Sequence, residues 1–300
     1  MQNGILNVYK ESGFTSHDVV AKLRGILKQK KIGHTGTLDP AAVGVLPICL
    51  GSATKAAEYL LESDKEYLAI LRLGVTTDTQ DMTGTVLKIA AVAVDEKAVQ
   101  DVFFHFIGDI EQLPPMYSAV RVNGKRLYEI ARLGQDVERK PRAVRISKLE
   151  IIKIDLPEIT FQVECTKGTY IRTLCHDIGD KLGCGGAMAA LTRTRVGEYK
   201  IEEALKLGQI EELTRADRIA TVIKGTDSVF TQLRVVKVAA AQMKLLMNGN
   251  KLMLSGVEVP PDITCGEEFR IYGSDGAFYG IYRYQQEQKQ LLPLKMISDR

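Results

Sequence analysis

The chain has no long uninterrupted apolar segment. The run Val43–Leu50 is short and contains Gly44 and Pro47, whereas a membrane-spanning helix needs about 20 apolar residues. The amino terminus also lacks the apolar stretch of a secretion signal. We therefore expect a soluble, cytoplasmic protein that does not act at a membrane.

Cysteines are few and do not form a recognisable framework. Five of them, an odd number, are scattered without a CxxC pair, which favours reduced thiols. Cys175, His176 and Cys184 come nearest to a zinc site, but no fourth ligand follows at finger-like spacing. The chain also lacks a P-loop and the full GxGxxG pattern of dinucleotide-binding proteins. We expect neither a metal nor a cofactor.

A strong net charge is lacking too. The 40 basic and 37 acidic residues leave a net charge of +3, which does not by itself identify a nucleic-acid-binding protein. The distribution is more informative, because the segment from Arg121 to Arg145 carries a local excess of +5. Such a segment fits contact with phosphates, and by itself fits a solvated charged surface equally well.

Three hundred residues, 45% of them hydrophobic, can bury a large core, and the length suggests two domains of about 150 residues. Thr15 and Asp18 form a capping-box pattern that predicts a helix starting near His17. Residues 96–107, 126–133 and 202–223 also have helical character. Gly225–Ser228 is predicted as a linker, followed by short strands and turns.

The segment Gly33–Pro40, GHTGTLDP, is the most distinctive in the chain. It places one carboxylate, Asp39, in a predicted loop between an amphipathic helix and an apolar strand, where a scaffold holds reactive groups well. Glycines in this loop let a bulky ligand approach the backbone. Spacing alone leaves a second interpretation open, because Asp-Pro after Gly and Thr is also a common turn.

GHTGTLDP resembles the catalytic-aspartate motif of the bacterial pseudouridine synthases that modify position 55 in the T-loop of tRNA, the TruB family. Three further segments resemble that family's remaining motifs in the same order, and together the motifs cover most of residues 1–200. They are Asp64–Gly84 (DKEYLAILRLGVTTDTQDMTG), Pro114–Ala119 (PPMYSA) and Lys167–Leu174 (KGTYIRTL).

The resemblance implies an α+β fold with two domains. Residues 1–228 would form the catalytic domain, a mixed and largely antiparallel sheet flanked by helices, with an RNA-binding insertion at about 115–145. Residues 229–300 would form a small PUA-like β-barrel that binds RNA.

The resemblance also assigns roles to individual residues. Asp39 would be the catalytic carboxylate, Arg172 its charge partner and Tyr67 the ring that stacks on the flipped uracil. Substrate-binding positions are His34, Tyr170 and Leu191, and weaker candidates for contact with the RNA backbone are Arg121, Lys125, Arg126 and Arg142. From the pattern alone, Tyr67 and Leu191 also suit core packing, and Arg172 also suits phosphate contact.

The predicted function is a stand-alone isomerase that converts uridine 55 of tRNA to pseudouridine by gripping the T-arm. We expect a monomer with no obligate protein partner. Two alternatives remain: a guide-dependent catalytic subunit that modifies ribosomal RNA, and a non-catalytic protein that binds or folds tRNA. The basic insertion favours the stand-alone enzyme, and a carboxylate paired inside the protein argues for catalysis.

Overall fold

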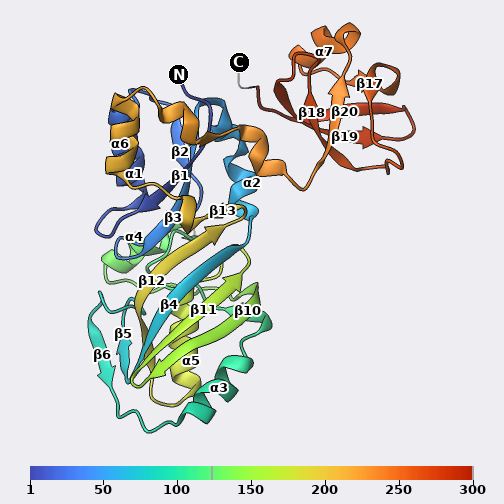
Figure 1. The fold of residues 1–300 in the computed structure, drawn as a ribbon. Coiled ribbons are helices and arrows are strands. Elements are labelled where there is room, and N and C mark those ends of the chain that lie inside the picture. The colour runs from blue at the N-terminus through green and yellow to red at the C-terminus, as the bar shows by residue number, and fades with distance from the viewer. Residues whose placement is uncertain (123, 299–300) are drawn as a thin grey trace.

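The computed structural model describes residues 1–122 and 124–298. One of the undescribed residues, 123, lies in the predicted insertion, and the other two end the predicted second domain. Figure 1 shows an elongated amino-terminal part built on a long sheet and a smaller carboxyl-terminal part set apart at one end. Within the described residues no helix is long and apolar enough to cross a membrane.

Ten strands of the described chain form the large sheet. Its main path, in spatial order, runs β14 (Ile223–Lys224), β1 (Gly4–Lys10), β3 (Val43–Leu50), β12 (Gly186–Val196), β4 (Lys65–Leu73), β11 (Glu158–Cys165), β10 (Arg142–Asp155) and β7 (Gly108–Gln112). Two short strands lie off this path, β2 (Ile32–His34) against β3 and β13 (Tyr199–Lys200) against β12. Among the described strands of this sheet only β3 and β12 pair in parallel, so the prediction of a mixed, largely antiparallel sheet is confirmed.

The parallel pair joins the two halves of the sheet, and we call this junction the seam. It is short, because only Thr192 and Arg193 of β12 pair with Val43 and Gly44 of β3. At Gly44 the backbone φ is +107° and a Cβ atom would lie 2.2 Å from the Arg193 carbonyl oxygen. A residue with a side chain would therefore push the two halves apart.

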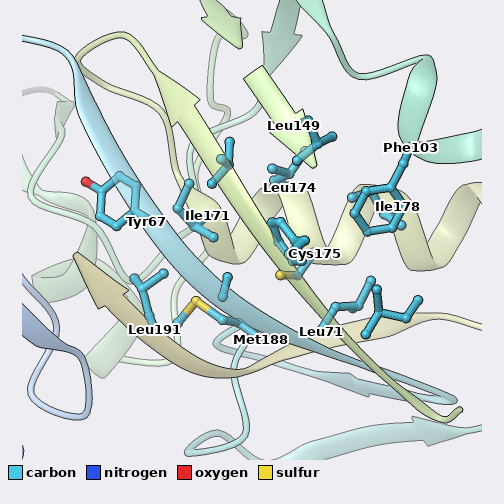
Figure 2. Close-up of a cluster of buried hydrophobic side chains, with 14 of the residues drawn as sticks. Tyr67, Leu71, Phe103, Leu149, Ile171, Leu174, Cys175, Ile178, Met188 and Leu191 are labelled. Carbon is cyan, nitrogen blue, oxygen red and sulfur yellow. The ribbon is translucent and has the colours of Figure 1, made fainter. Parts of the chain in front are cut away.

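Helices cover each half of the sheet. α5 (Ile171–Lys181) and α3 (Glu96–Phe104) pack on the half that contains β4, β11 and β10. Leu174, Cys175 and Ile178 of α5 are completely buried because they recur at helical spacing. Figure 2 shows these side chains together with Phe103 of α3 in one apolar cluster.

The other half has a second core, into which α1 (Ser16–Ile26) and α6 (Leu207–Arg215) pack. α1 begins as predicted, with Thr15 as its N-cap and a complete capping box to Asp18. The predicted helix over 202–223 is wrong in extent. Short 3-10 turns at Ile201–Glu203 and Ile219–Val222 flank α6, and Asp217 between them has a φ of +54°, which an α-helix cannot continue through.

The segment between β7 and β10 is an excursion from the sheet. It contains β8 (Arg121–Val122), β9 (Lys125–Arg126) and α4 (Leu127–Arg132), which confirms the predicted short helix there. A second ribbon, β5 (Val75–Thr77) with β6 (Val86–Ile89), extends beyond β4.

The carboxyl-terminal part is a six-stranded sheet that curls into a nearly closed barrel, as the sequence predicts. Its strands, in spatial order, are β16 (Leu252–Met253), β20 (Gln290–Met296), β19 (Phe278–Gln285), β18 (Glu268–Tyr272), β15 (Arg234–Val238) and β17 (Val257–Glu258), and α7 (Met243–Met247) completes it. The barrel has a core of its own.

The connection to the barrel differs from the predicted linker. Residues Thr226–Phe230 form a 3-10 helix, and both Thr226 and Phe230 are fully buried. Phe230 packs with Ala56 from the amino-terminal part and Phe278 from the barrel. A small apolar cluster therefore joins the two parts, so the connection is a packed element rather than a solvated segment.

Candidate active site

Asp39 lies on a loop that two neighbouring elements, α1 and β1, hold in place. Ser16 at the start of α1 donates its hydroxyl proton to the Leu38 carbonyl (3.4 Å) and accepts from the Leu38 amide (2.9 Å). The buried ammonium of Lys10 in β1 donates to the Pro40 carbonyl (3.2 Å). The loop is therefore fixed on both sides of Asp39, whose side chain stays 37% exposed and accessible.

Arg172 is the charge partner of Asp39, and their contact has two prongs. The Arg172 Nε atom lies 3.0 Å from Asp39 Oδ2, and Nη2 donates to Oδ1 at 3.3 Å. The guanidinium also donates to two backbone carbonyls. Nη1 donates to the carbonyl of Thr79 (3.1 Å) and Nη2 to that of Tyr117 (2.9 Å). Only 7% of the Arg172 side chain is exposed, so the pair has a buried cation and a reachable anion.

The pKa of Asp39 is raised from its usual 3.8. Burial is the largest cause, and it outweighs the Arg172 charge, which lowers the pKa. Asp81 raises it further and Lys10 lowers it. The expected cation is thus present, but the balance of burial and a second carboxylate leaves the pKa above that of a free aspartate.

Asp81 is a further residue of this site, one that the sequence did not predict. This buried carboxylate places Oδ2 3.9 Å from Arg172 Nε, while its Oδ1 accepts from the Thr83 amide (3.0 Å) and the Thr79 hydroxyl (2.8 Å). Asp81 lies within the segment that resembles a family motif, which was the available signal. No local pattern indicates its contact with Arg172, which lies 91 positions later in the chain.

Tyr67 and Leu191 lie together on neighbouring strands, β4 and β12, and each is 9% exposed. Figure 2 shows Tyr67 at one end of the apolar cluster, with its hydroxyl directed away from the cluster and Leu191 close by. Alternation along β4 places Tyr67 on the core face, as predicted. Burial raises the pKa of its hydroxyl.

Tyr170 and His34 are also at the ends of elements that lead to this region. Tyr170 caps α5, where its amide donates to Gln112 Oε1 (2.9 Å) directly before Ile171 and Arg172. His34 ends β2, five residues before Asp39, and burial lowers the pKa of its imidazole. Its buried Nδ1 has no hydrogen-bond partner among the described residues.

The four basic candidates of the insertion, Arg121, Lys125, Arg126 and Arg142, are all exposed. Arg126 donates to the Tyr128 hydroxyl (2.9 Å), which keeps it on the surface of α4. These positions do not contribute to the Asp39–Arg172 contact, so the structure separates a buried reactive centre from an exposed basic excursion.

The mixed sheet with its appended barrel is shared with solved structures described below, and matches to family models show that the class of protein is a pseudouridine synthase. The family follows from two family models. TruB family pseudouridylate synthase (N terminal domain) matches residues 24–171, and tRNA pseudouridylate synthase B C-terminal domain matches residues 172–231. The chain belongs to the TruB family, and both matches end before the six-stranded barrel.

Relatives of nearly equal length agree with this assignment. The chain is 47% identical to the tRNA pseudouridine synthase B of Lachnoclostridium phytofermentans, with 98% of this chain and 99% of that protein covered. It is 43% identical to the tRNA pseudouridine synthase B of Burkholderia mallei, with 94% and 93% covered.

Solved structures with a similar fold are more distant in sequence. A Cbf5-Nop10-Gar1 complex contains a chain with a TM-score of 0.76 and 28% identity, covering 99% of this chain and 85% of that one. An H/ACA RNP bound to a substrate RNA containing 2'-deoxyuridine gives a TM-score of 0.75 and 26% identity, covering 99% and 86%.

Proposed function

We propose that this protein isomerises a uridine in the T-loop of tRNA, position 55, to pseudouridine and that it acts without a guide RNA. The observation that carries the proposal is the two-pronged contact of Arg172 with Asp39, at 3.0 and 3.3 Å, in a chain of the TruB family. The relatives named tRNA pseudouridine synthase B supply the substrate class.

The reaction breaks the bond between ribose and the base nitrogen and joins the ribose to a base carbon, so the atoms balance without an added group or an oxidant. Asp39 is the catalytic carboxylate in this proposal. It attacks the base, attacks the sugar or removes a sugar proton, and each route needs the same ionised, reachable oxygen. Arg172 orients that oxygen through its planar fork and favours the ionised form.

The target uridine must leave its stack in the folded loop before it can reach Asp39, which costs a few kcal/mol. Tyr67 recovers part of this cost by stacking on the uracil, with Leu191 beside it in the same apolar cluster. Tyr170 bounds the pocket from the start of α5, and His34 contacts the remodelled RNA loop next to the Asp39 loop.

The exposed basic residues of the insertion, Arg121, Lys125, Arg126 and Arg142, hold RNA phosphates in this proposal. Residues 1–228 form the catalytic domain, and residues 229–300 form the PUA-like domain that adds RNA contacts. In this proposal the protein is a cytoplasmic monomer with no obligate protein partner. Size-exclusion chromatography with light scattering tests the monomeric state directly.

A guide-dependent subunit is the second candidate, because chains in an H/ACA RNP and a Cbf5-Nop10-Gar1 complex share the fold. Sequence favours the stand-alone enzyme. Identity rises from 26–28% with those chains to 41–47% with proteins named tRNA pseudouridine synthase B.

The deciding experiment incubates the purified chain with an unmodified tRNA transcript and no other RNA or protein, and then measures pseudouridine at each uridine. A transcript with cytidine at position 55 is the matched control. Formation of pseudouridine only in the first transcript supports the proposal. Tight binding without product would instead indicate the non-catalytic protein, and activity only with an added guide RNA would indicate the second candidate.

A further inference from the structure

Arg193 of β12 is a fully buried guanidinium at the seam, 1% exposed. Its Nε donates to the Val45 carbonyl of β3 at 2.7 Å. Its Nη2 donates to the carbonyl of Gly36 at 3.3 Å, three residues before Asp39. One side chain thus binds the strand and the reactive loop together.

The backbone that carries this side chain is itself fixed. Arg193 pairs with Gly44 across the seam and with Tyr67 on the other side, in β4. The absence of a Cβ at Gly44 allows the two strands to approach at Arg193. The guanidinium is therefore held by rigid strands rather than by a mobile loop.

Arg193 differs from the other arginines of this region in its partners. Arg172 contacts Asp39, and Arg195, two residues along β12, contacts Glu164 at 2.8 Å. In residues 1–122 and 124–298 no carboxylate lies within 4.0 Å of the Arg193 guanidinium. A buried charge without a counter-charge is costly, so its retention calls for a partner of another kind.

That partner is Tyr67, which is the register partner of Arg193 in the β12–β4 pairing and whose hydroxyl and the guanidinium shift each other's pKa. The interaction lowers the pKa of Tyr67 against the larger effect of burial, so the cation favours negative charge at this oxygen. On each of the three routes open to Asp39, the electrons of the broken or attacked bond leave negative charge on the uracil. In the proposed function that uracil stacks on the Tyr67 ring.

Building on the proposed function, we propose that Arg193 is a positioning residue that fixes the Tyr67 hydroxyl and the Asp39 loop in one arrangement, and that its unpaired charge favours the negative charge developing on the uracil. Strands β3 and β4 and the Asp39 loop supply the contacts of Arg193. Because no described carboxylate pairs with it, its charge can act on the uracil that stacks on Tyr67 in the proposed function. A guanidinium suits this task because it stays protonated when buried and donates in several fixed directions.

The test compares Arg193→Gln, which keeps hydrogen-bond donors and removes the charge, with Arg193→Lys, which keeps the charge and loses the fork. Arg195→Gln is the matched control, since it removes an ion-paired arginine from the same strand. Turnover and KM are measured on unmodified tRNA, with thermal unfolding of each variant. We expect Arg193→Gln to lower kcat by about 100-fold with little change in KM. Arg193→Lys should lose less, and Arg195→Gln should leave kcat within about twofold.

A double-mutant cycle with Tyr67→Phe provides the second measurement and covers the case in which Arg193→Gln does not fold. If Arg193 acts through the Tyr67 hydroxyl, a change at Arg193 costs much less in the Tyr67→Phe background than in the wild type. The Lys variant is used for the cycle if the Gln variant is unfolded. Additive losses, or a kcat within about twofold of wild type for Arg193→Gln, would overturn the inference. Inactivity of the wild-type protein on tRNA would instead contradict the proposed function.

Discussion

The proposed function needs Asp39 in its ionised form, although burial disfavours a charge at this position. Arg172 favours the ionised form, whereas burial and Asp81 oppose it, and the net pKa lies above 3.8. Asp81 therefore has two effects on the site. It lies 3.9 Å from the Arg172 Nε, which helps to hold that guanidinium, and it repels the carboxylate that the guanidinium serves.

Replacing Asp39 with Asn should abolish turnover and leave tRNA affinity within about threefold, because an amide keeps the shape but is a poor nucleophile and base. Affinity is measured by filter binding, and product by pseudouridine detection under single-turnover conditions. Substantial product from Asp39→Asn would show that another group carries the reaction.

The raised pKa of Asp39 predicts the acid side of the activity profile. In the proposed function activity needs the carboxylate, so activity should fall as pH drops through a value above 3.8. In Asp81→Asn the repulsion is gone, and the acid limb should move to lower pH while the plateau falls because Arg172 is held less firmly. Asp78→Asn, in the same loop, is the control and should leave the limb in place. A limb that is unchanged in Asp81→Asn would contradict the electrostatic account.

Among helices and strands, sequence patterns predicted the structure correctly where an element has one apolar face or a clear cap. Alternation located β4 and the core side of Tyr67, and the capping box located α1. After residue 202 only α6 has an apolar face that packs into a core, and the positive φ of Asp217 prevents the helix from continuing to residue 223. Buried polar residues were the other limit. Arg193 and Arg195 look alike in the sequence, and only the register shift between them makes one buried and the other ion-paired.

The motifs account for what was predicted of the site. Asp39, Arg172 and Tyr67 each lie in a segment that resembles the family, so the resemblance could propose them, and the structure brings Asp39 and Arg172 into contact. The contact of Arg172 with the carbonyls of Thr79 and Tyr117 depends on loops far apart in the chain, and no local pattern encodes it.

The first residues of β10, which follow the basic excursion, offer a test with a matched pair of arginines. Arg142 is exposed and has no ion-pair partner among the described residues, whereas Arg145 contacts Asp109 at 3.0 Å. We expect Arg142→Glu to weaken tRNA binding and reduce the slope of log affinity against log salt by about 1, and Arg145→Glu to do less. Equal effects of the two variants, or an unchanged slope, would argue against phosphate contact at Arg142.

At the scale of the whole molecule, the barrel is attached by packing. Phe230 stands at the centre of the joining cluster, with its ring 4.8 Å from that of Tyr59 in an edge-on arrangement. The cluster combines residues from α2 (Ala57–Glu62) and its preceding turn with residues of the barrel, so the two parts support each other.

Truncating Phe230 to Ala should lower the free energy of unfolding by about 3–5 kcal/mol, because the cavity it leaves is lined by both parts. Urea titration followed by circular dichroism measures the loss. The control is Phe104→Ala, where the ring is 75% exposed and the change should stay within about 0.5 kcal/mol. If Phe230→Ala lowered the free energy of unfolding no more than Phe104→Ala does, the two parts would be joined by the chain alone and not by packing.

The seam supplies the last prediction. A methyl group at Gly44 would lie 2.2 Å from the Arg193 carbonyl, at a φ of +107°, so Gly44→Ala should shift β3 against β12. We expect kcat to fall by at least about 10-fold, a fall produced by small displacements of reacting groups. Gly208→Ala in α6, where a Cβ meets nothing within 4 Å, is the control and should retain full activity. Normal turnover in a folded Gly44→Ala protein would refute the prediction.

The position of the seam makes the Asp39–Arg172 contact more sensitive to structural disturbance than the fold is. Asp39 follows β2 and precedes β3 on one side of it, while Arg172 and Tyr67 belong to elements on the other side. The distance between Asp39 and Arg172 therefore depends on how the two halves of the sheet pack against each other. A disturbance that shifts one half against the other can leave each core packed and still separate the carboxylate from its guanidinium, so on the proposed function activity would be lost before the fold.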